Sequence, residues 1–217
     1  MIIFGSGEIA SLARFYFEND YGMKVKAFTV DDDYADGGPF EGIPCVPFSQ
    51  ALRDFPPETT DIHVALSYRG LNRLRQSKFE QCHEYRRVSY ISSKAIRWPD
   101  FSAGANSFVL EQNNIQPRVR LGDNNMLWSG NHIGHGTVIG NHNYFASHVV
   151  VSGNCKIGDR NFFGVNATVK DFTTIGNDCF ITMDASVTKD MPDGSVAIGR
   201  EIITGEKADR IKGGYFG

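Results

Sequence analysis

The stretch Ile133-Gly134-His135-Gly136-Thr137-Val138-Ile139-Gly140 contains the pattern that decides the fold. An aliphatic residue followed by glycine recurs after six positions, and a small residue stands two positions before the second aliphatic one. A helix repeats after about 3.6 residues and an ordinary strand after every second residue, so a period of six fits neither. It fits short strands joined by turns, each strand placing one large and one small side chain inside.

The same period continues on both sides of this stretch. Every sixth position from residue 109 to residue 187 holds an aliphatic side chain or phenylalanine, without a shift of register: Val109, Ile115, Leu121, Leu127, Ile133, Ile139, Phe145, Val151, Ile157, Phe163, Val169, Ile175, Ile181 and Val187. So long a regular series predicts a repeat architecture in which stacked units bury one continuous core.

The composition changes near residue 100. Residues 1–100 contain six Glu and two Asn, whereas residues 101–200 contain one Glu and twelve Asn. Glu favours helices, whereas Asn tolerates left-handed turn conformations. We therefore expect a ligand-binding domain at 1–97, a turn-rich repeat domain at 98–200, and a C-terminal tail at 201–217 that ends loosely after a short helix.

The overall composition excludes several classes of protein. The chain has 217 residues and a formal net charge of −3, which gives no basic surface for nucleic acid. No apolar run approaches the roughly 20 residues that cross a bilayer, so no membrane partner is expected. The four cysteines lie far apart without a Cys-x-x-Cys pair, which predicts reduced thiols and a cytoplasmic protein without a metal site.

The first hundred residues alternate between apolar strands and helical segments. The expected strands cover 1–4, 24–30, 62–67 and 87–92, and the expected helices 9–19 and 71–85. A glycine turn at Gly5-Ser6-Gly7 joins the first strand to the first helix, and glycines there let backbone N–H groups approach a phosphate. The segment has room for half of a doubly wound domain. It predicts a small Rossmann-like βαβ domain that binds a nucleotide-linked ligand.

Both halves resemble known proteins. The repeat resembles the hexapeptide-repeat acyltransferases, and nearly the whole chain resembles the PglD/NeuD family of bacterial sugar acetyltransferases. The family motif Ile-x-His-acid-x-x-Ile-Gly matches residues 133–140, apart from the acid. The resemblance implies a left-handed parallel β-helix with three hexapeptides per coil, a homotrimer with active sites between subunits, acetyl-CoA as cosubstrate and no metal.

The resemblance also assigns site residues. The catalytic base falls on His135, and Gly136 stands where the family has the acid that orients it, so we expect Asn131, His132 or a neighbouring subunit to supply the orienting group. The contacts to acetyl-CoA fall on Tyr144, Val165 and Met183. The contacts to the nucleotide-linked sugar fall on Ser6, Gly7, Glu8, Asp31, Asp32, Ser67 and Tyr68.

Four histidines lie between residues 132 and 148, none of them at an inward position of the repeat. Acyl transfer from a thioester needs a base at neutral pH, where imidazole titrates. The sequence thus favours an acetyl-CoA-dependent N-acetyltransferase acting on a nucleotide-linked amino sugar in surface glycan biosynthesis. Two alternatives stay open: an O-acetyltransferase acting on a sugar hydroxyl, as in sialic acids, and a non-catalytic trimeric scaffold.

Overall fold

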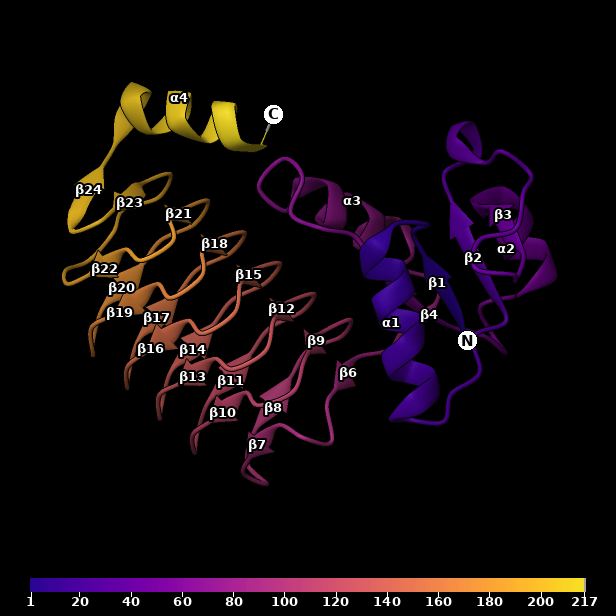
Figure 1. Ribbon diagram of the computed structural model, residues 1–217, viewed down its shortest axis with the longest axis horizontal. Coiled ribbons are helices and arrows are strands. Elements are labelled where there is room, and N and C mark those ends of the chain that lie inside the picture. The colour runs from indigo at the N-terminus through magenta and orange to yellow at the C-terminus, as the bar shows by residue number, and fades with distance from the viewer. Residues whose placement is uncertain (217) are drawn as a thin grey trace.

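The computed structural model describes residues 1–216. Figure 1 shows a small α/β domain beside a long stack of coils whose strands lie in three sheets. Both parts of the predicted fold are confirmed. Within the described range, none of the helices combines the length and the apolar character needed to cross a membrane.

The N-terminal domain is a parallel sheet of strand order β3-β2-β1-β4-β5. Its elements are, in chain order, β1 (Ile2–Phe4), α1 (Glu8–Asn19), β2 (Ala27–Val30), η1 (Asp32–Tyr34), β3 (Cys45–Pro47), α2 (Phe48–Asp54), β4 (Asp61–Val64), α3 (Arg73–Gln81) and β5 (Arg86–Arg87). The elements η1, β3 and α2 were not predicted from the sequence. The carboxyl ends of β1, β2 and β4 meet at one sheet edge, which is where such sheets bind ligands.

The segment expected as one strand at 87–92 divides between the two domains. Arg87 lies in β5, whereas β6 (Tyr90–Ile91) pairs in parallel with β9 (Phe108–Val109) of the coil stack. The backbone N–H of Tyr90 donates to the carbonyl of Ser107 at 2.8 Å. The first coil therefore begins before the boundary expected at residue 97, directly after the N-terminal sheet.

Three sheets form the faces of the β-helix, and successive parallel strands of a face are about one coil apart, while β24 extends the first face in antiparallel pairing with β23. The first face contains β6, β9, β12 (Met126–Leu127), β15 (Tyr144–Phe145), β18 (Phe162–Phe163), β21 (Phe180–Ile181), β23 (Val196–Ile198) and β24 (Glu201–Ile203). The second contains β7 (Ile96–Arg97), β10 (Asn114–Ile115), β13 (His132–Ile133), β16 (Val150–Val151), β19 (Thr168–Val169) and β22 (Ser186–Val187). The third contains β8 (Ser102–Ala103), β11 (Arg120–Leu121), β14 (Val138–Ile139), β17 (Lys156–Ile157) and β20 (Thr174–Ile175).

The interior of the coils holds the predicted aliphatic series. All of its members from Val109 to Val187 are buried in one core, where the rings of Phe145 and Phe163 stack with their centroids 4.3 Å apart. Asparagine fills some of the small inward positions, and the Asn143 N–H donates to Asn125 Oδ1 of the preceding coil at 2.9 Å. Buried asparagines therefore satisfy backbone groups between coils, as buried polar groups require.

The corners between faces explain a further part of the Asn excess. Every sixth residue from Asn106 to Asp184 has a positive φ, a conformation that Gly, Asn and Asp adopt at the lowest cost. His142 and His148 occupy two of these corner positions, with φ of 61° and 60°. The corner geometry therefore also fixes where two of the four clustered histidines lie.

The C-terminal segment is ordered through residue 216, in contrast to the loose end expected from its glycines. The helix α4 (Gly205–Phe216) follows β24 and runs back over the first face toward the N-terminal domain (Figure 1). Phe216 is buried against Phe162 and Phe180, and its carbonyl accepts a hydrogen bond from the Gly70 N–H at 3.1 Å. Aromatic burial holds this end because each ring removes a large apolar area from water.

Candidate functional site

Two adjoining cavities lie along the carboxyl edge of the N-terminal sheet, and the second of them extends to the β-helix and α4. The first, which we call the sheet-edge cavity, has a volume of about 610 Å³ and is lined by residues including Ser6, Gly7, Asp31 and Lys78. The second, the aromatic cavity, has a volume of about 670 Å³. Gly7, Leu66 and Arg69 line both, so one elongated ligand can occupy the two cavities together.

The sheet-edge cavity surrounds the glycine turn between β1 and α1. Gly5 has a φ of 127°, and a β-carbon there would lie 2.7 Å from the carbonyl oxygen of Ala65, so this position requires glycine. The carbonyl of Gly7 accepts hydrogen bonds from the N–H groups of Ala10 and Ser11 at 2.9 and 3.0 Å. The first N–H groups of a helix have no intrahelical partner, and together with the helix dipole they attract phosphate.

Asp31 and Asp32 have different roles, although both were predicted to contact the ligand. Asp31 lines the sheet-edge cavity and pairs with Lys78 of α3 at 2.7 Å. Asp32 lines neither cavity. Its Oδ1 accepts a hydrogen bond from the Ser49 N–H at 3.0 Å, which holds the pKa of the Asp32 carboxyl below its usual value. Asp32 therefore stabilises the first turn of α2.

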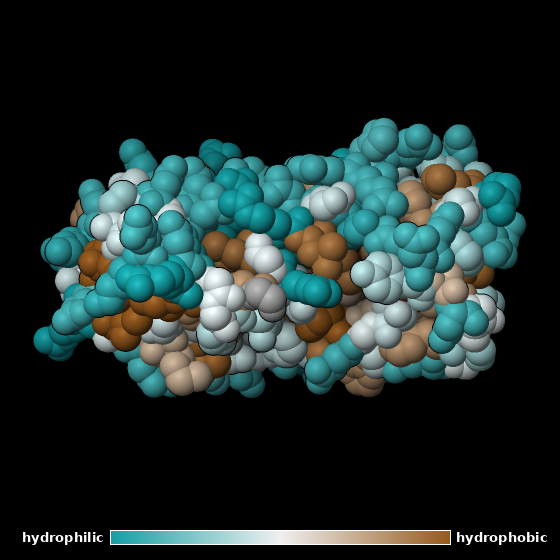
Figure 2. All heavy atoms as spheres, turned by 90° about the horizontal axis from the view of Figure 1, so that it is seen from above, coloured by the Kyte–Doolittle hydropathy of each residue, from teal (hydrophilic) through white to brown (hydrophobic). Residues whose placement is uncertain are grey.

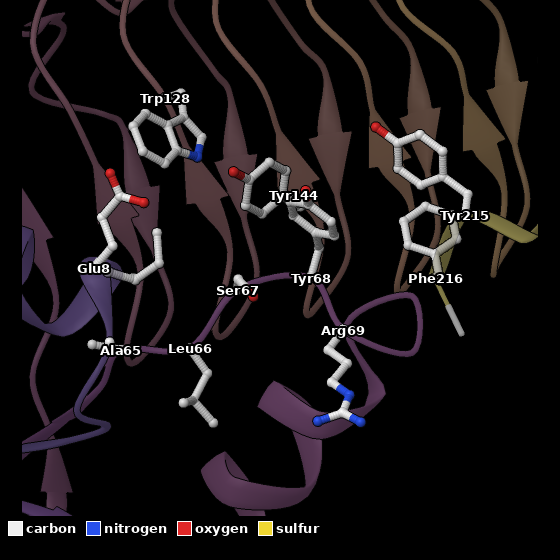
Figure 3. A pocket seen from close by; sticks show the side chains of 12 residues that line it. Glu8, Ala65, Leu66, Ser67, Tyr68, Arg69, Trp128, Tyr144, Tyr215 and Phe216 are labelled. Carbon is white, nitrogen blue, oxygen red and sulfur yellow. The ribbon is translucent and has the colours of Figure 1, made fainter.

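Three parts of the molecule, the N-terminal domain, the β-helix and α4, form the aromatic cavity (Figure 3). Its lining includes Glu8, Ser67 and Tyr68 of the N-terminal domain, Trp128 and Tyr144 of the β-helix, and Tyr215 and Phe216 of α4. Tyr68 packs edge-on against Tyr144, with 5.0 Å between ring centroids, and burial raises the pKa of the Tyr144 phenol. The structure thus brings four of the predicted sugar contacts, Gly7, Glu8, Ser67 and Tyr68, together with one of the predicted acetyl-CoA contacts.

The surface around these cavities is mixed in character. Figure 2 shows apolar side chains reaching the surface in the middle of the face seen from above, between the end that carries the β-helix and the N-terminal domain. Most of the surrounding surface in this view is hydrophilic. An apolar hollow with a polar rim is the usual form of a small-molecule site.

Arg75 of α3 fixes the N-terminal domain against the β-helix beside Tyr144. Its side chain is buried, and Nη2 donates to the carbonyls of His142 and Asn143, each at 3.0 Å. Burial lowers the pKa of the Arg75 guanidinium to about 10. Because a buried cation needs acceptors, these two carbonyls specify how α3 sits on the coils.

His135 lies on a different side of the molecule. It follows β13 on the edge between the second and third faces, is exposed, and lines neither cavity. Its backbone N–H and its Nδ1 both contact Oε1 of Gln116, at 2.8 and 3.1 Å. The expected partners within the chain do not contact it: Asn131 is buried and donates to the Trp128 carbonyl, and no hydrogen bond joins His132 to His135 in the described residues.

Val165 and Met183 lie on a third side. They follow β18 and β21 on the edge between the first and second faces, with exposed fractions of 39% and 65%. A single chain therefore places the predicted residues of the β-helix at three locations: His135 on one edge, Val165 and Met183 on another, and Tyr144 on the first face. His135 is separated from Val165 and Met183 by the width of the second face.

The other clustered histidines have varied surroundings. His132 is half-buried in β13, and His148 is exposed with its ring over Gly130. His142 is buried beneath Phe79 of α3, and this burial lowers the pKa of its imidazole to about 4. Within residues 1–216, no three His, Cys, Asp or Glu side chains group closely enough to hold a metal ion.

Several residues of the site were not predicted from the sequence. Gln116 precedes His135 by 19 residues, one coil plus one residue, so the register of the repeat could have identified it. Lys78, Trp128 and Tyr215 carry no comparable signal, because they reach the cavities only through the docking of separate segments.

Residues 104–153 match the family model described as bacterial transferase hexapeptide (six repeats). No curated protein sequence matches the chain.

Several solved structures have the same architecture. The acetyltransferase domain of PglB from Neisseria gonorrhoeae FA1090, in complex with acetyl coenzyme A, is 23% identical, with a TM-score of 0.78 over 90% of this chain and 93% of that chain. A histidine-to-asparagine mutant of perosamine N-acetyltransferase from Caulobacter crescentus, in complex with CoA and GDP-perosamine, is 26% identical, with a TM-score of 0.83 over 94% and 96% of the two chains. WeeI from Acinetobacter baumannii AYE is 16% identical, with a TM-score of 0.61 over 93% and 97%. These findings confirm the left-handed β-helix and the resemblance to PglD/NeuD-like sugar acetyltransferases.

Proposed function

We propose that this chain, an acetyltransferase of the hexapeptide-repeat class, transfers an acetyl group from acetyl-CoA to the amino group of a nucleotide-linked sugar for surface glycan synthesis. The observation that carries the proposal is the pair of adjoining cavities, one beside a glycine turn and helix N-terminus and the other lined by aromatic rings. The perosamine N-acetyltransferase structure, which holds CoA and GDP-perosamine, supports this substrate class.

The cavities suit the two ends of such a substrate. In the sheet-edge cavity, the first turn of α1 and Arg69 supply positive charge for a diphosphate, and Asp31, held by its ion pair with Lys78, is an acceptor for hydroxyl or N–H groups of the nucleoside. The lining of the aromatic cavity includes Tyr68, Trp128 and Tyr144, whose rings offer apolar surface to a sugar. Gly7, which lines both cavities, would lie near the junction of sugar and diphosphate.

The reaction would take place between subunits, because one chain does not bring His135 to the aromatic cavity. We propose a homotrimer in which the edge carrying His135 approaches the cavity side of a neighbouring copy. Val138 and Val150, exposed by 46% and 39% on the two faces that flank this edge, supply apolar area for the contact. Val165 and Met183 of that neighbouring copy, on the edge that borders its first face, would then contact acetyl-CoA in the groove between the two subunits.

His135 would act as the general base. The neutral amine attacks the thioester carbonyl carbon, and Nε2 of His135 accepts the proton that the nitrogen loses as the C–N bond forms. The C–S bond then breaks, and the imidazolium returns this proton to the thiolate of CoA. A base of this kind contributes about 10²–10⁴ to the rate.

Release of free thiol from acetyl-CoA tests the function. We expect thiol release with nucleotide-linked amino sugars and none with matched sugars that carry a hydroxyl in place of the amine. Thiol release with the hydroxy sugars alone would replace the proposal with O-acetylation. Failure of every sugar nucleotide to elicit thiol release from a folded protein would favour the non-catalytic scaffold.

A further inference from the structure

We propose that Gln116 is the positioning residue of the base His135. Its neutral amide takes the role of the acid that the family motif has where this chain has Gly136. Its side-chain carbonyl selects the tautomer of His135 in which Nδ1 carries the hydrogen and Nε2 is free. The catalytic part of this inference rests on the proposed function, whereas the tautomer itself does not.

The identity of the hydrogen-bonding atoms follows from the contacts alone. The backbone N–H of His135, which can only donate, lies 2.8 Å from the end of the Gln116 side chain, so the atom there is the carbonyl oxygen. The same oxygen lies 3.1 Å from Nδ1 of His135. An amide oxygen has lone pairs and no hydrogen, so Nδ1 must donate. A neutral imidazole has one N–H, which leaves the lone pair on Nε2.

Gln116 is itself held in place. Its backbone N–H donates to the carbonyl of Ile133 at 3.0 Å, as part of the pairing between neighbouring coils. On the other side, the ring of His135 rests on Gly153 of the following coil, where a β-carbon would lie 2.6 Å from Cε1. The imidazole is thus fixed from the preceding and the following coil.

The surroundings of His135 contain no competing carboxylate partner. The charged residues at neighbouring corners of this edge are Arg118 in the preceding corner, Asp100 one corner before that, and Lys170 and Asp171 two corners further along. Asp100 accepts a hydrogen bond from the Arg118 backbone N–H at 2.7 Å, and none of the four has a hydrogen bond or ion pair to His135 in the described part of the chain. A carboxylate partner would stabilise the charged imidazolium, whereas an amide orients the ring without adding a charge.

The tautomer can be measured without any assay of activity. In the full-length protein labelled with ¹⁵N at histidine, the imidazole nitrogen shifts of His135, assigned by their absence in H135N, should report a protonated Nδ1. In Q116A this preference should be lost, while Gln50→Ala, at a half-buried glutamine of α2 remote from the repeat, should leave the spectrum unchanged. A wild-type His135 protonated at Nε2, or an unchanged spectrum in Q116A, would overturn the proposal.

Activity gives a second readout. We expect Q116A to lower kcat by about 10- to 100-fold with little change in KM, because the base is misplaced while the ligand cavities are intact. Gln116→Glu keeps the acceptor and adds a charge, so the acidic limb of its pH–rate profile should move up by about one pH unit or more. Wild-type kcat and pH profile in both variants would remove Gln116 from catalysis. If every substrate fails while the tautomer is as expected, only the proposed function falls.

Discussion

The imidazole of His135 lies on Gly153 of the next coil, so close that an added β-carbon would stand 2.6 Å from Cε1 and 2.9 Å from Nε2. Gly153 is not among the glycines with positive φ, so its backbone conformation suits other residues as well. The histidine ring, and not the chain conformation, therefore requires glycine at this position.

Gly153→Ala should consequently impair the reaction more than the fold. The added methyl group displaces the ring of the proposed base, and a shift of about 1 Å can cost about 100-fold in rate. We expect kcat to fall by this order, measured by thiol release, with a thermal midpoint close to that of the wild type. Gly213→Ala, where the added β-carbon meets no atom within 4 Å, is the matched control. Full activity in G153A would show that the ring position does not matter.

Replacement of His135 by Asn should cost about 10²–10⁴ in kcat, because the proton acceptor is removed. The side chain is exposed, so unfolding by urea should be nearly unchanged. His83→Asn serves as control, since His83 is also exposed and lies in the N-terminal domain just after α3. Near-normal turnover of a folded H135N protein would eliminate His135 as the base.

The two neighbouring aspartates should respond differently to the same substitution. Asp31→Asn weakens the ion pair with Lys78 at the sheet-edge cavity, and we expect a higher KM for the sugar nucleotide. Asp32→Asn weakens the acceptor for Ser49 and should lower the thermal midpoint without raising KM. Each variant is the control of the other. Equal effects of both on KM would contradict the separate roles.

The buried histidines should make the protein sensitive to acid. Burial lowers the pKa of His63 and of His142 to about 4, below the value of about 6.5 in the unfolded chain. The unfolded state therefore binds more protons below pH 6.5, so stability is full above this pH and falls as the pH approaches 4, by up to roughly 3 kcal/mol per histidine.

Urea midpoints at several values between pH 7.5 and 4.5 measure this effect. His142→Asn should flatten the fall of the urea midpoint with decreasing pH, because it removes one of the two buried imidazoles. The corner tolerates Asn, since the equivalent corner of the preceding coil holds Asn124 with φ of 56°. His83→Asn, at an exposed histidine, is the control variant, in which the urea midpoint should still fall with decreasing pH. A midpoint that does not change with pH in the wild type would refute the prediction.

Tyr215 should contribute to substrate affinity more than to folding. It lines the aromatic cavity from α4 and is 52% exposed, so Tyr215→Ala removes a wall of the cavity without opening a buried core. We expect KM for the sugar nucleotide to rise several-fold, in line with about 1 kcal/mol for an aromatic contact. Phe15→Ala, 59% exposed on α1 and outside both ligand cavities, is the matched control. An unchanged KM in Y215A would exclude this wall from the site.

The sequence by itself determined the β-helix down to individual positions. Each coil repeats the same contacts with the next, so the six-residue period encodes both the inward series from Val109 to Val187 and the corners with positive φ, where Asn, Gly and Asp hold eight of the positions. Even the contact of Gln116 with His135 follows this register, since the two residues lie at adjacent positions of neighbouring coils.

Only the tertiary structure decided how the non-repeating parts surround the ligand site. Tyr68, Tyr144 and Tyr215 come together because aromatic burial and the hydrogen bonds of Arg75 dock the N-terminal domain and α4 onto the first face. The same docking leaves His135 on an edge remote from that cavity. Such contacts join segments far apart in the chain and depend on the shape of both surfaces, so no local period of the sequence records them.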